Sequence, residues 1–207
     1  MIQQTFLHQS KQLIAGIDEA GRGSLAGPVV AAAVILDRKS LIGGLRDSKE
    51  LSVGRRFELA CEIRQHSLAW SVAWADAAEI DHLNILEATF LAMRRAILGL
   101  HIKPHYVQID GNHLPKLTFG ADQIEGEAIV RGDATNVAIS AASIIAKVCR
   151  DEIMVKLDDI YPNYGFARHK GYATMDHRKC IDRFGACQQH RRSFRPFRSI
   201  TFIERKG

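Results

Sequence analysis

A short apolar segment near the start of the chain ends in two adjacent carboxylates and a glycine-rich turn. Residues 13–17 are apolar and predict a buried β-strand, which Asp18 closes with Glu19 beside it. A strand holds a carboxylate rigidly, and a metal site requires rigid ligands. The same pattern also fits an ordinary strand-to-turn transition, so other parts of the chain must distinguish the two.

The turn that follows consists of Gly21, Arg22 and Gly23. Glycine has no Cβ, so the backbone there can approach another molecule closely and present its N–H groups. The planar guanidinium of arginine suits phosphate. Carboxylates for hard cations next to an arginine loop for phosphate together predict metal-assisted phosphoester chemistry.

The hydrophobic pattern predicts mainly strands early in the chain and an alternation of helices and strands later. This order is typical of an α/β domain with a mixed sheet, here followed by a helical, basic C-terminal portion. Residues 68–74 alternate large and small and predict a strand, with Trp70 and Trp74 assigned to the core. Further strands are expected at residues 28–36, 106–110 and 127–130, and helices at residues 52–66, 84–98, 137–160 and 175–184.

Acidic residues recur at the ends of the predicted strands. Asp110 ends one strand beside a glycine, and Asp133 follows another. Because sites in open α/β sheets gather at the carboxyl ends of strands, Asp18, Asp110 and Asp133 occupy equivalent places and support the metal interpretation. Each also has a simpler explanation, an Asx-type turn at Asp110 and a plain loop at residues 131–133.

Small residues open the long helix predicted at residues 137–160. Ser140 and Ser143 lie there with two alanines between them. Their hydroxyl groups and the helix N-terminus could meet a phosphate. Close packing of the helix on the sheet explains the same small residues and is compatible with the first interpretation.

The charge of the chain is concentrated in its last part. Net charge is +5, yet residues 168–206 alone hold eleven Lys or Arg and three Asp or Glu. This asymmetry predicts a polyanionic partner, with Arg191 and Arg192 among the expected phosphate contacts. Aromatic residues are interleaved with these charges, as on surfaces that grip nucleic acid. The alternative is a solvated basic face.

Nothing in the sequence predicts a membrane or secreted protein. No run of eighteen apolar residues occurs, and residues 1–11 lack the apolar core of a signal peptide. The four cysteines show no zinc-like spacing and are expected to be reduced thiols. We therefore expect a cytoplasmic protein.

A set of short motifs appears in a specific order from Ile14 to Phe197. They are Ile17–Gly23, Asp47–Lys49, Ile109–Asn112, Gly132–Asp133, Ala141–Val148, Arg150–Asp151, Tyr164–Phe166, His169–Tyr172 and His190–Phe194. Together these motifs resemble ribonuclease HII, the type 2 ribonuclease H of bacteria. The departures are minor: Ser24, Ala173 and Phe197 stand where proline, glycine or proline, and valine are common in the family. Ala173 bears only on the detailed setting of Tyr172.

The resemblance implies a fold and a division of the chain. The fold is that of ribonuclease H, an α/β architecture with a mixed five-stranded sheet flanked by helices and a helical basic region against the substrate. Residues 1–207 would form a single catalytic domain. Within it we expect an α/β core at residues 12–160, a helical basic substrate-binding region at residues 161–198, and a tail at residues 199–207.

The resemblance also implies roles for individual residues. Two Mg²⁺ or Mn²⁺ ions would be held by four carboxylates. The loop Gly21, Arg22 and Gly23 would contact the ribonucleotide and its 2′-hydroxyl, and Tyr172 would pack on the sugar just past the RNA–DNA junction, unless it is a core tyrosine. Lys49, Ser143 and Lys170 fall near substrate phosphates. The four carboxylates, expected to be both catalytic and metal-binding, are Asp18, Glu19, Asp110 and Asp133.

The implied activity is that of a metal-dependent endoribonuclease. It would cut the RNA strand of RNA–DNA hybrids and cleave 5′ to ribonucleotides embedded in duplex DNA, leaving a 3′-hydroxyl and a 5′-phosphate. Such an enzyme would act, as a monomer, in ribonucleotide removal, DNA repair and RNA primer removal. Replication or repair proteins that bind it cannot be read from the sequence.

Two other functions fit parts of the pattern. Ribonuclease HIII, the sister type, carries an extra N-terminal domain, whereas only thirteen residues precede the first strand motif here. A nucleic-acid-binding module without catalysis would not need all four acidic positions, and all four are present. Ribonuclease HII is therefore the expected function.

Overall fold

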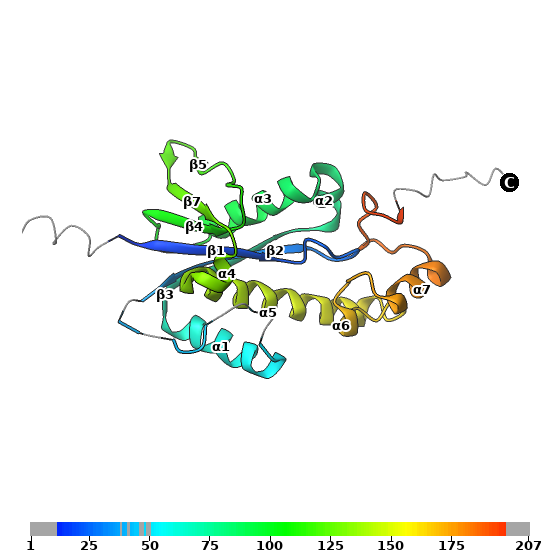
Figure 1. Ribbon diagram of the computed structural model, residues 1–207. Coiled ribbons are helices and arrows are strands. Elements are labelled where there is room, and N and C mark those ends of the chain that lie inside the picture. The colour runs from blue at the N-terminus through cyan, green and yellow to red at the C-terminus, as the bar shows by residue number, and fades with distance from the viewer. Residues whose placement is uncertain (1–11, 38, 41, 46–47, 49–50, 198–207) are drawn as a thin grey trace, which may run out of the picture.

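The computed structural model describes residues 12–197 except 38, 41, 46–47 and 49–50. It is built around a five-stranded mixed sheet with the strand order β3-β2-β1-β4-β7 (Figure 1). β1 pairs antiparallel with β2 and parallel with β4, so the sheet changes from antiparallel to parallel at its centre. The predicted mixed sheet is confirmed. Its strands are β1 (Ile14–Ala20), β2 (Val29–Leu36), β3 (Ser67–Ala75), β4 (Tyr106–Asp110) and β7 (Glu125–Ile129).

The four predicted helices are present, and two of them begin directly after Ser52 and Asn84. Ser52 caps α1 and Asn84 caps α3, each through its side-chain oxygen. The pattern missed α2 (Ala77–Leu83), a short helix that Asp76 begins with a capping box, and the small hairpin of β5 (Thr118–Phe119) and β6 (Asp122–Gln123). The other helices are α1 (Val53–His66), α3 (Ile85–Leu98), α4 (Gly132–Thr135), α5 (Val137–Ile160), α6 (Phe166–His169) and α7 (Met175–Phe184).

Helices cover both faces of the sheet. In Figure 1, α2 and α3 lie on one face, and α1 and α5 lie on the other. Each face has its own apolar core cluster. A Cβ on Gly16 would lie 2.1 Å from the carbonyl carbon of Ala138, so α5 packs directly on β1 at this glycine. The close packing brings the first turns of α5 next to the acidic end of β1.

Two expectations about strands were wrong in detail. β1 continues to Ala20, so Asp18 and Glu19 lie inside the strand and not at its end. Trp70 and Trp74 are not core residues, since they are 37% and 51% exposed. The reason is the place of β3 at the edge of the sheet, where its side chains have fewer neighbours; the guanidinium of Arg64 lies over the Trp70 ring at 5.5 Å.

The C-terminal region returns to the loop that follows β1. The N–H of Leu25 donates to the carbonyl of Gly171 at 2.8 Å, and that of Gly27 donates to Gln189 at 2.9 Å. The N–H of Arg191 donates to Leu25 at 2.8 Å. Residues that are far apart in sequence thus form one surface beside the end of β1. Among the helices that the structure describes, none has the length and apolar character needed to cross a membrane.

Candidate metal centre and substrate cavity

Three aspartates from three different elements converge at one edge of the sheet. Asp18 comes from β1, Asp110 ends β4, and Asp133 lies in α4. One carboxylate oxygen of each lies within 4.8 Å of the others. We call this group the acidic cluster. The metal interpretation predicted this convergence, which spacing in the sequence could not prove.

The sheet itself brings the acidic cluster together. Ile17 pairs with Ile109 across the parallel strands, so the next residues, Asp18 and Asp110, lie side by side. The backbone N–H of Asp133 donates to Oδ1 of Asp110 at 3.3 Å. The hydroxyl of Ser140 donates to the carbonyl of Asp133 at 2.6 Å and anchors α4 to α5. Strand register and a helix start therefore position all three carboxylates.

The electrostatics of Asp18 fit a bound cation. Burial raises the pKa of Asp18 well above its ordinary value, and the neighbouring carboxylates Glu19 and Asp110 raise it further. A hydrogen bond from Ser143 opposes this shift. Carboxylates crowded in a buried place are costly to ionise, and a divalent cation would relieve both causes. The three aspartates are consistent with divalent metal binding.

Glu19 and the glycine-rich turn lie against the same cavity. Its volume is about 260 Å³, and it is lined by Asp18, Glu19, Asp110 and the turn. The carboxylate of Glu19 accepts a hydrogen bond from Nη1 of Arg22 at 3.2 Å. Gly21 has a φ of 95°, a conformation that L side chains rarely adopt, which explains the glycine.

Tyr172 is a surface residue of this cavity and not a core tyrosine. It is 38% exposed and lines the cavity together with Ser143. The core tyrosine of the region is Tyr164, which is buried and stacks on Phe166 with ring centroids 5.4 Å apart. The geometry removes the alternative that the sequence left open for Tyr172.

Of the two other predicted phosphate contacts, only Lys170 is among the described residues, and it does not line this cavity. Lys170 lines a neighbouring groove between α1, α5 and α6, and its Nζ donates to the carbonyl of Ala167. Lys49 lies outside the described residues. Ser143, in contrast, faces the cavity, and its hydroxyl lies 2.9 Å from that of Ser48.

One cation at the cavity was not singled out from the sequence. Lys147 lines the cavity, and its Nζ lies 6.0 Å from the centroid of the Tyr172 ring. Its partner is Asp151, at 2.5 Å. Lys147 follows Ser143 by four residues on α5, so helical spacing puts both on one face and could have identified it.

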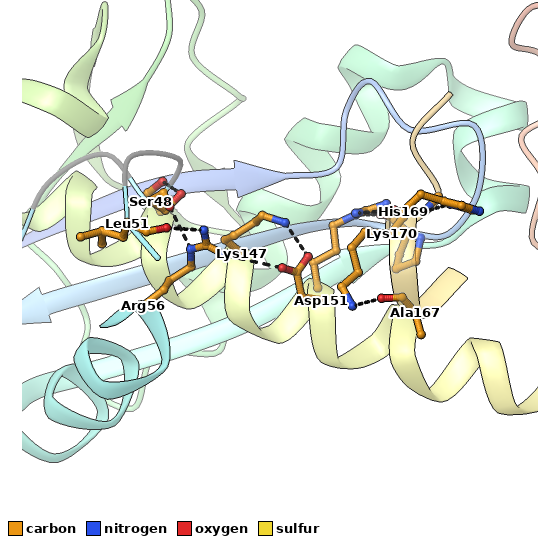
Figure 2. A network of polar contacts seen from close by, with 12 residues as sticks. Ser48, Leu51, Arg56, Lys147, Asp151, Ala167, His169 and Lys170 are labelled. Atoms are coloured by element: carbon orange, nitrogen blue, oxygen red, sulfur yellow. Dashed lines mark hydrogen bonds and ion pairs between the residues drawn. The ribbon is translucent and has the colours of Figure 1, made fainter. Parts of the chain in front are cut away.

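Figure 2 shows how α1 is tied to this part of α5. Nε of Arg56 donates to the carbonyl of Ser48 at 2.8 Å, and Nη2 donates to that of Leu51 at 2.9 Å. Nη1 of Arg56 also lies 3.7 Å from Asp151, the partner of Lys147. Ser48, which lines the cavity, and Leu51 are therefore tied to α1.

The expectation that Arg191 contacts phosphate was wrong. Its side chain is fully buried and donates to three backbone carbonyl oxygens, of Gly21, Arg22 and Gly27. A side chain enclosed in this way cannot reach a polyanion. Arg192 is exposed, so only the second arginine of the pair remains available for the predicted contact.

Comparison with known proteins gives the family. A sequence model described as ribonuclease HII matches residues 15–197. A ribonuclease HII from Albidiferax ferrireducens is 55% identical over 198 residues, which cover 96% of this chain and 93% of that protein. The chain belongs to the ribonuclease HII family.

Solved structures of ribonucleases H have the same fold as this chain. Ribonuclease H2 from Pyrococcus horikoshii OT3 matches with a TM-score of 0.73 and 28% identity, covering 90% of this chain and 95% of that one. The structure of Bst-RNase HIII in complex with Mn²⁺ matches with a TM-score of 0.70 and 20% identity, covering 90% of this chain and 68% of that one. At this identity the second likeness shows the fold alone.

Family membership confirms the predicted fold and activity. The chain has the ribonuclease H-like α/β fold and is a ribonuclease HII endonuclease with an acidic metal-binding site. The family model and the similar sequence are those of ribonuclease HII, whereas ribonuclease HIII is matched here by its fold. The chain is therefore an enzyme and not a binding module without catalysis.

Proposed function

We propose that this enzyme cleaves the phosphodiester bond 5′ to a ribonucleotide, both in RNA–DNA hybrids and at single ribonucleotides within duplex DNA. The observation that carries the proposal is one cavity lined by Asp18 and Asp110 of the acidic cluster, by the glycine-rich turn and by an exposed tyrosine. The first feature suits hydrolysis of a phosphodiester, and the other two suit recognition of a sugar. A duplex DNA substrate, in turn, favours a cytoplasmic enzyme that acts in ribonucleotide removal.

The four carboxylates Asp18, Glu19, Asp110 and Asp133 would hold two Mg²⁺ or Mn²⁺ ions. When bound, such ions supply an activated water and stabilise charge on the leaving oxygen. Asp18 is kept in place by β1 and by its hydrogen bond with Ser143. Bst-RNase HIII, which shares this fold, has been solved in complex with Mn²⁺.

The reaction is a hydrolysis. Water adds to phosphorus and the P–O3′ bond breaks, so the ribonucleotide keeps a 5′-phosphate and the preceding nucleotide gains a 3′-hydroxyl. The side chain of Lys147 at the cavity wall is suited to a substrate phosphate. The backbone of residues 21–23 would donate to the 2′-hydroxyl, the group that distinguishes RNA from DNA within a duplex.

A cleavage assay tests the proposal. The substrates are a duplex with a single ribonucleotide, a long RNA–DNA hybrid and an all-DNA duplex of the same sequence. We expect cleavage of the first two in Mg²⁺ or Mn²⁺, none after chelation, and 3′-hydroxyl ends that a DNA polymerase extends. Cleavage of the long hybrid without cleavage at the lone ribonucleotide would contradict the proposed substrate.

A further inference from the structure

Two arginines are buried behind the glycine-rich turn and Tyr172. Arg150 belongs to α5 and Arg191 follows α7, and both are fully buried. Arginine is rarely buried completely, because taking its charge out of water is costly. Burial lowers the pKa of Arg191 to about 9, and the charge of Arg150 adds to this effect. Such an arrangement calls for an explanation in the contacts that both side chains make.

Both guanidinium groups bind backbone carbonyl oxygens of the same loop. Arg191 donates through Nη2 to Gly21 and through Nη1 to Arg22, each at 2.8 Å, and through Nε to Gly27 at 3.0 Å. Arg150 donates through Nε to Pro28 at 3.0 Å and through Nη2 to Ala26 at 3.3 Å. We call residues 21–28 the arginine-supported loop. The rigid fork of each side chain suits several fixed acceptors at once.

The contacts of Arg191 determine where the amide groups of the turn point. In a planar trans peptide the N–H points opposite to the C=O. Because the carbonyls of Gly21 and Arg22 face Arg191, the N–H groups of Arg22 and Gly23 point away from it. Both residues line the cavity, as do Asp18 and Asp110 of the acidic cluster. The buried guanidinium of Arg191 thus orients the N–H groups of Arg22 and Gly23 toward the opposite side of the turn.

Arg150 joins the turn to Tyr172. Its Nη1 donates to the carbonyl of Lys170 at 3.0 Å, and its guanidinium carbon lies 5.5 Å from the centroid of the Tyr172 ring. A Cβ on Gly21 would lie 1.9 Å from its Nε, so the turn rests directly on this side chain. One side chain therefore fixes the distance between the turn and the tyrosine ring.

We propose that Arg150 and Arg191 are positioning residues for ribonucleotide recognition: Arg191 orients the N–H groups of the turn, and Arg150 holds Tyr172 at a fixed place beside it. The inference rests on the proposed function, in which the turn and Tyr172 contact the ribonucleotide and the next sugar. Neither arginine touches the substrate. A purely structural role would lower thermal stability and leave the activity of the folded protein unchanged.

The test compares lysine variants, which keep the charge and lose the fork. Arg191→Lys and Arg150→Lys are assayed well below their melting temperatures, beside Arg94→Lys as the matched control. Arg94, on α3, also donates to two backbone carbonyls, those of Lys116 and Thr118, and none of these residues lines the cavity. The kcat and KM are measured on the lone-ribonucleotide duplex and on the long hybrid.

We expect Arg191→Lys to lower kcat/KM on both substrates by about tenfold to a hundredfold, the range for small misplacements of positioned groups. Arg150→Lys should lower it mainly on the lone ribonucleotide and add little to Tyr172→Ala, because both changes act through one ring. Arg94→Lys should match the wild type on both substrates.

If a lysine variant does not fold, Gly21→Ala replaces it in the test. This change perturbs the contact between the turn and Arg150 while both arginines remain. It should reproduce the loss on both substrates. Wild-type kinetics of folded Arg150→Lys and Arg191→Lys, with Tyr172→Ala impaired, would overturn the inference and leave the proposed function intact. If Tyr172→Ala itself cut both substrates normally, the proposed role of Tyr172 would fail, and the Arg150 half of the inference with it.

Discussion

The acidic cluster and the arginine-supported loop meet at one cavity, yet they are held in place in different ways. The cluster depends on the register of two neighbouring parallel strands and on the start of α4. The loop depends on side chains that lie 122 to 170 residues away in the sequence. The comparison indicates that the sheet positions the hydrolytic groups, whereas Arg150 of α5 and Arg191 of the C-terminal region position the groups proposed to recognise the sugar.

The largest expected effect concerns the cluster. Asp18→Asn or Asp110→Asn removes a ligand charge that the ions need, and metal activation contributes several kcal/mol to lowering the barrier. Since each 1.36 kcal/mol is a factor of ten, we expect activity to fall by about a thousandfold or more, with binding of the hybrid retained. A gel-shift assay and a cleavage assay in Mg²⁺ measure both quantities.

The matched control is Asp122→Asn, which changes an exposed aspartate that pairs with Lys103 at 2.8 Å in the β5–β6 hairpin region. It should cut like the wild type. Wild-type turnover by Asp18→Asn or Asp110→Asn would remove the basis for separating a hydrolytic region from a recognition region.

The next effect concerns Tyr172, at the boundary of the two regions. Tyr172→Ala should reduce cleavage at a lone ribonucleotide by roughly tenfold to a hundredfold, with little change in melting temperature because the ring is 38% exposed. Tyr172→Phe should keep most of the activity, since the ring and not the hydroxyl would pack on the sugar. A thermal melt and a cleavage assay on both variants test this.

Tyr164→Ala serves as the opposite case. Tyr164 is buried, and the loss of a core aromatic ring costs about 3–5 kcal/mol. The Tyr164→Ala variant should have a lower melting temperature, while its folded fraction should cleave the substrate like the wild type. If Tyr172→Ala behaved in the same way, Tyr172 would have a structural role and no role in recognition.

The same contrast explains what the sequence could predict. Asp18, Asp110 and Asp133 follow hydrophobic runs, and the rule that sites gather at strand ends was enough to propose that they form one site, although Asp18 lies inside β1 and not at its end. The individual strands and the longer helices also followed from periodicity and caps, whereas the five-stranded sheet was implied by the resemblance to the family. The exposure of Trp70 and Trp74 did not follow, because a strand's place at the edge of a sheet is set by pairing and not by its own pattern.

Arg191 and Arg192 show most directly what could not be predicted from the sequence. They are adjacent in sequence and identical in type, yet one is enclosed by the arginine-supported loop and the other faces solvent. Composition assigned both to the basic surface. The carbonyl oxygens that bind Arg191 lie up to 170 residues away, so no local pattern carries this information.

A smaller effect is expected from pH, which should change the stability of the folded protein through buried histidines. The C-terminal region contains three buried histidines, His169, His177 and His190. The N–H of Cys187 donates to Nδ1 of His190 at 3.0 Å, so Nε2 of His190 carries the proton and donates to Nε2 of His177 at 3.1 Å. This arrangement requires neutral rings. Burial lowers the pKa of His190 to about 4, and His177, His169 and Arg192 add to the effect.

The consequence for stability has a definite sign. Unfolded histidine has a pKa of about 6.5, so between pH ~6.5 and ~4 the unfolded chain binds more protons than the folded one. The stabilisation is therefore complete above pH ~6.5 and is lost as the pH falls toward ~4. We expect the melting temperature to decline over this range and His190→Gln to flatten the decline. His113→Gln, at an exposed histidine, should leave it unchanged.

The smallest expected effect concerns Arg192. Arg192 is exposed, and its backbone N–H is fixed by Asp81 at 2.8 Å, so its side chain is free to contact a backbone phosphate. Arg192→Gln should weaken binding to all duplexes alike and reduce the slope of log K against log salt by about 0.9, the value for one phosphate contact. Arg55→Gln is the control, because Arg55 lies on α1 and pairs with Glu58 at 3.1 Å. An unchanged slope for Arg192→Gln would mean that the basic C-terminal stretch serves only to support the loop, and recognition of the duplex backbone would then have to come from other cations at the cavity, such as Lys147.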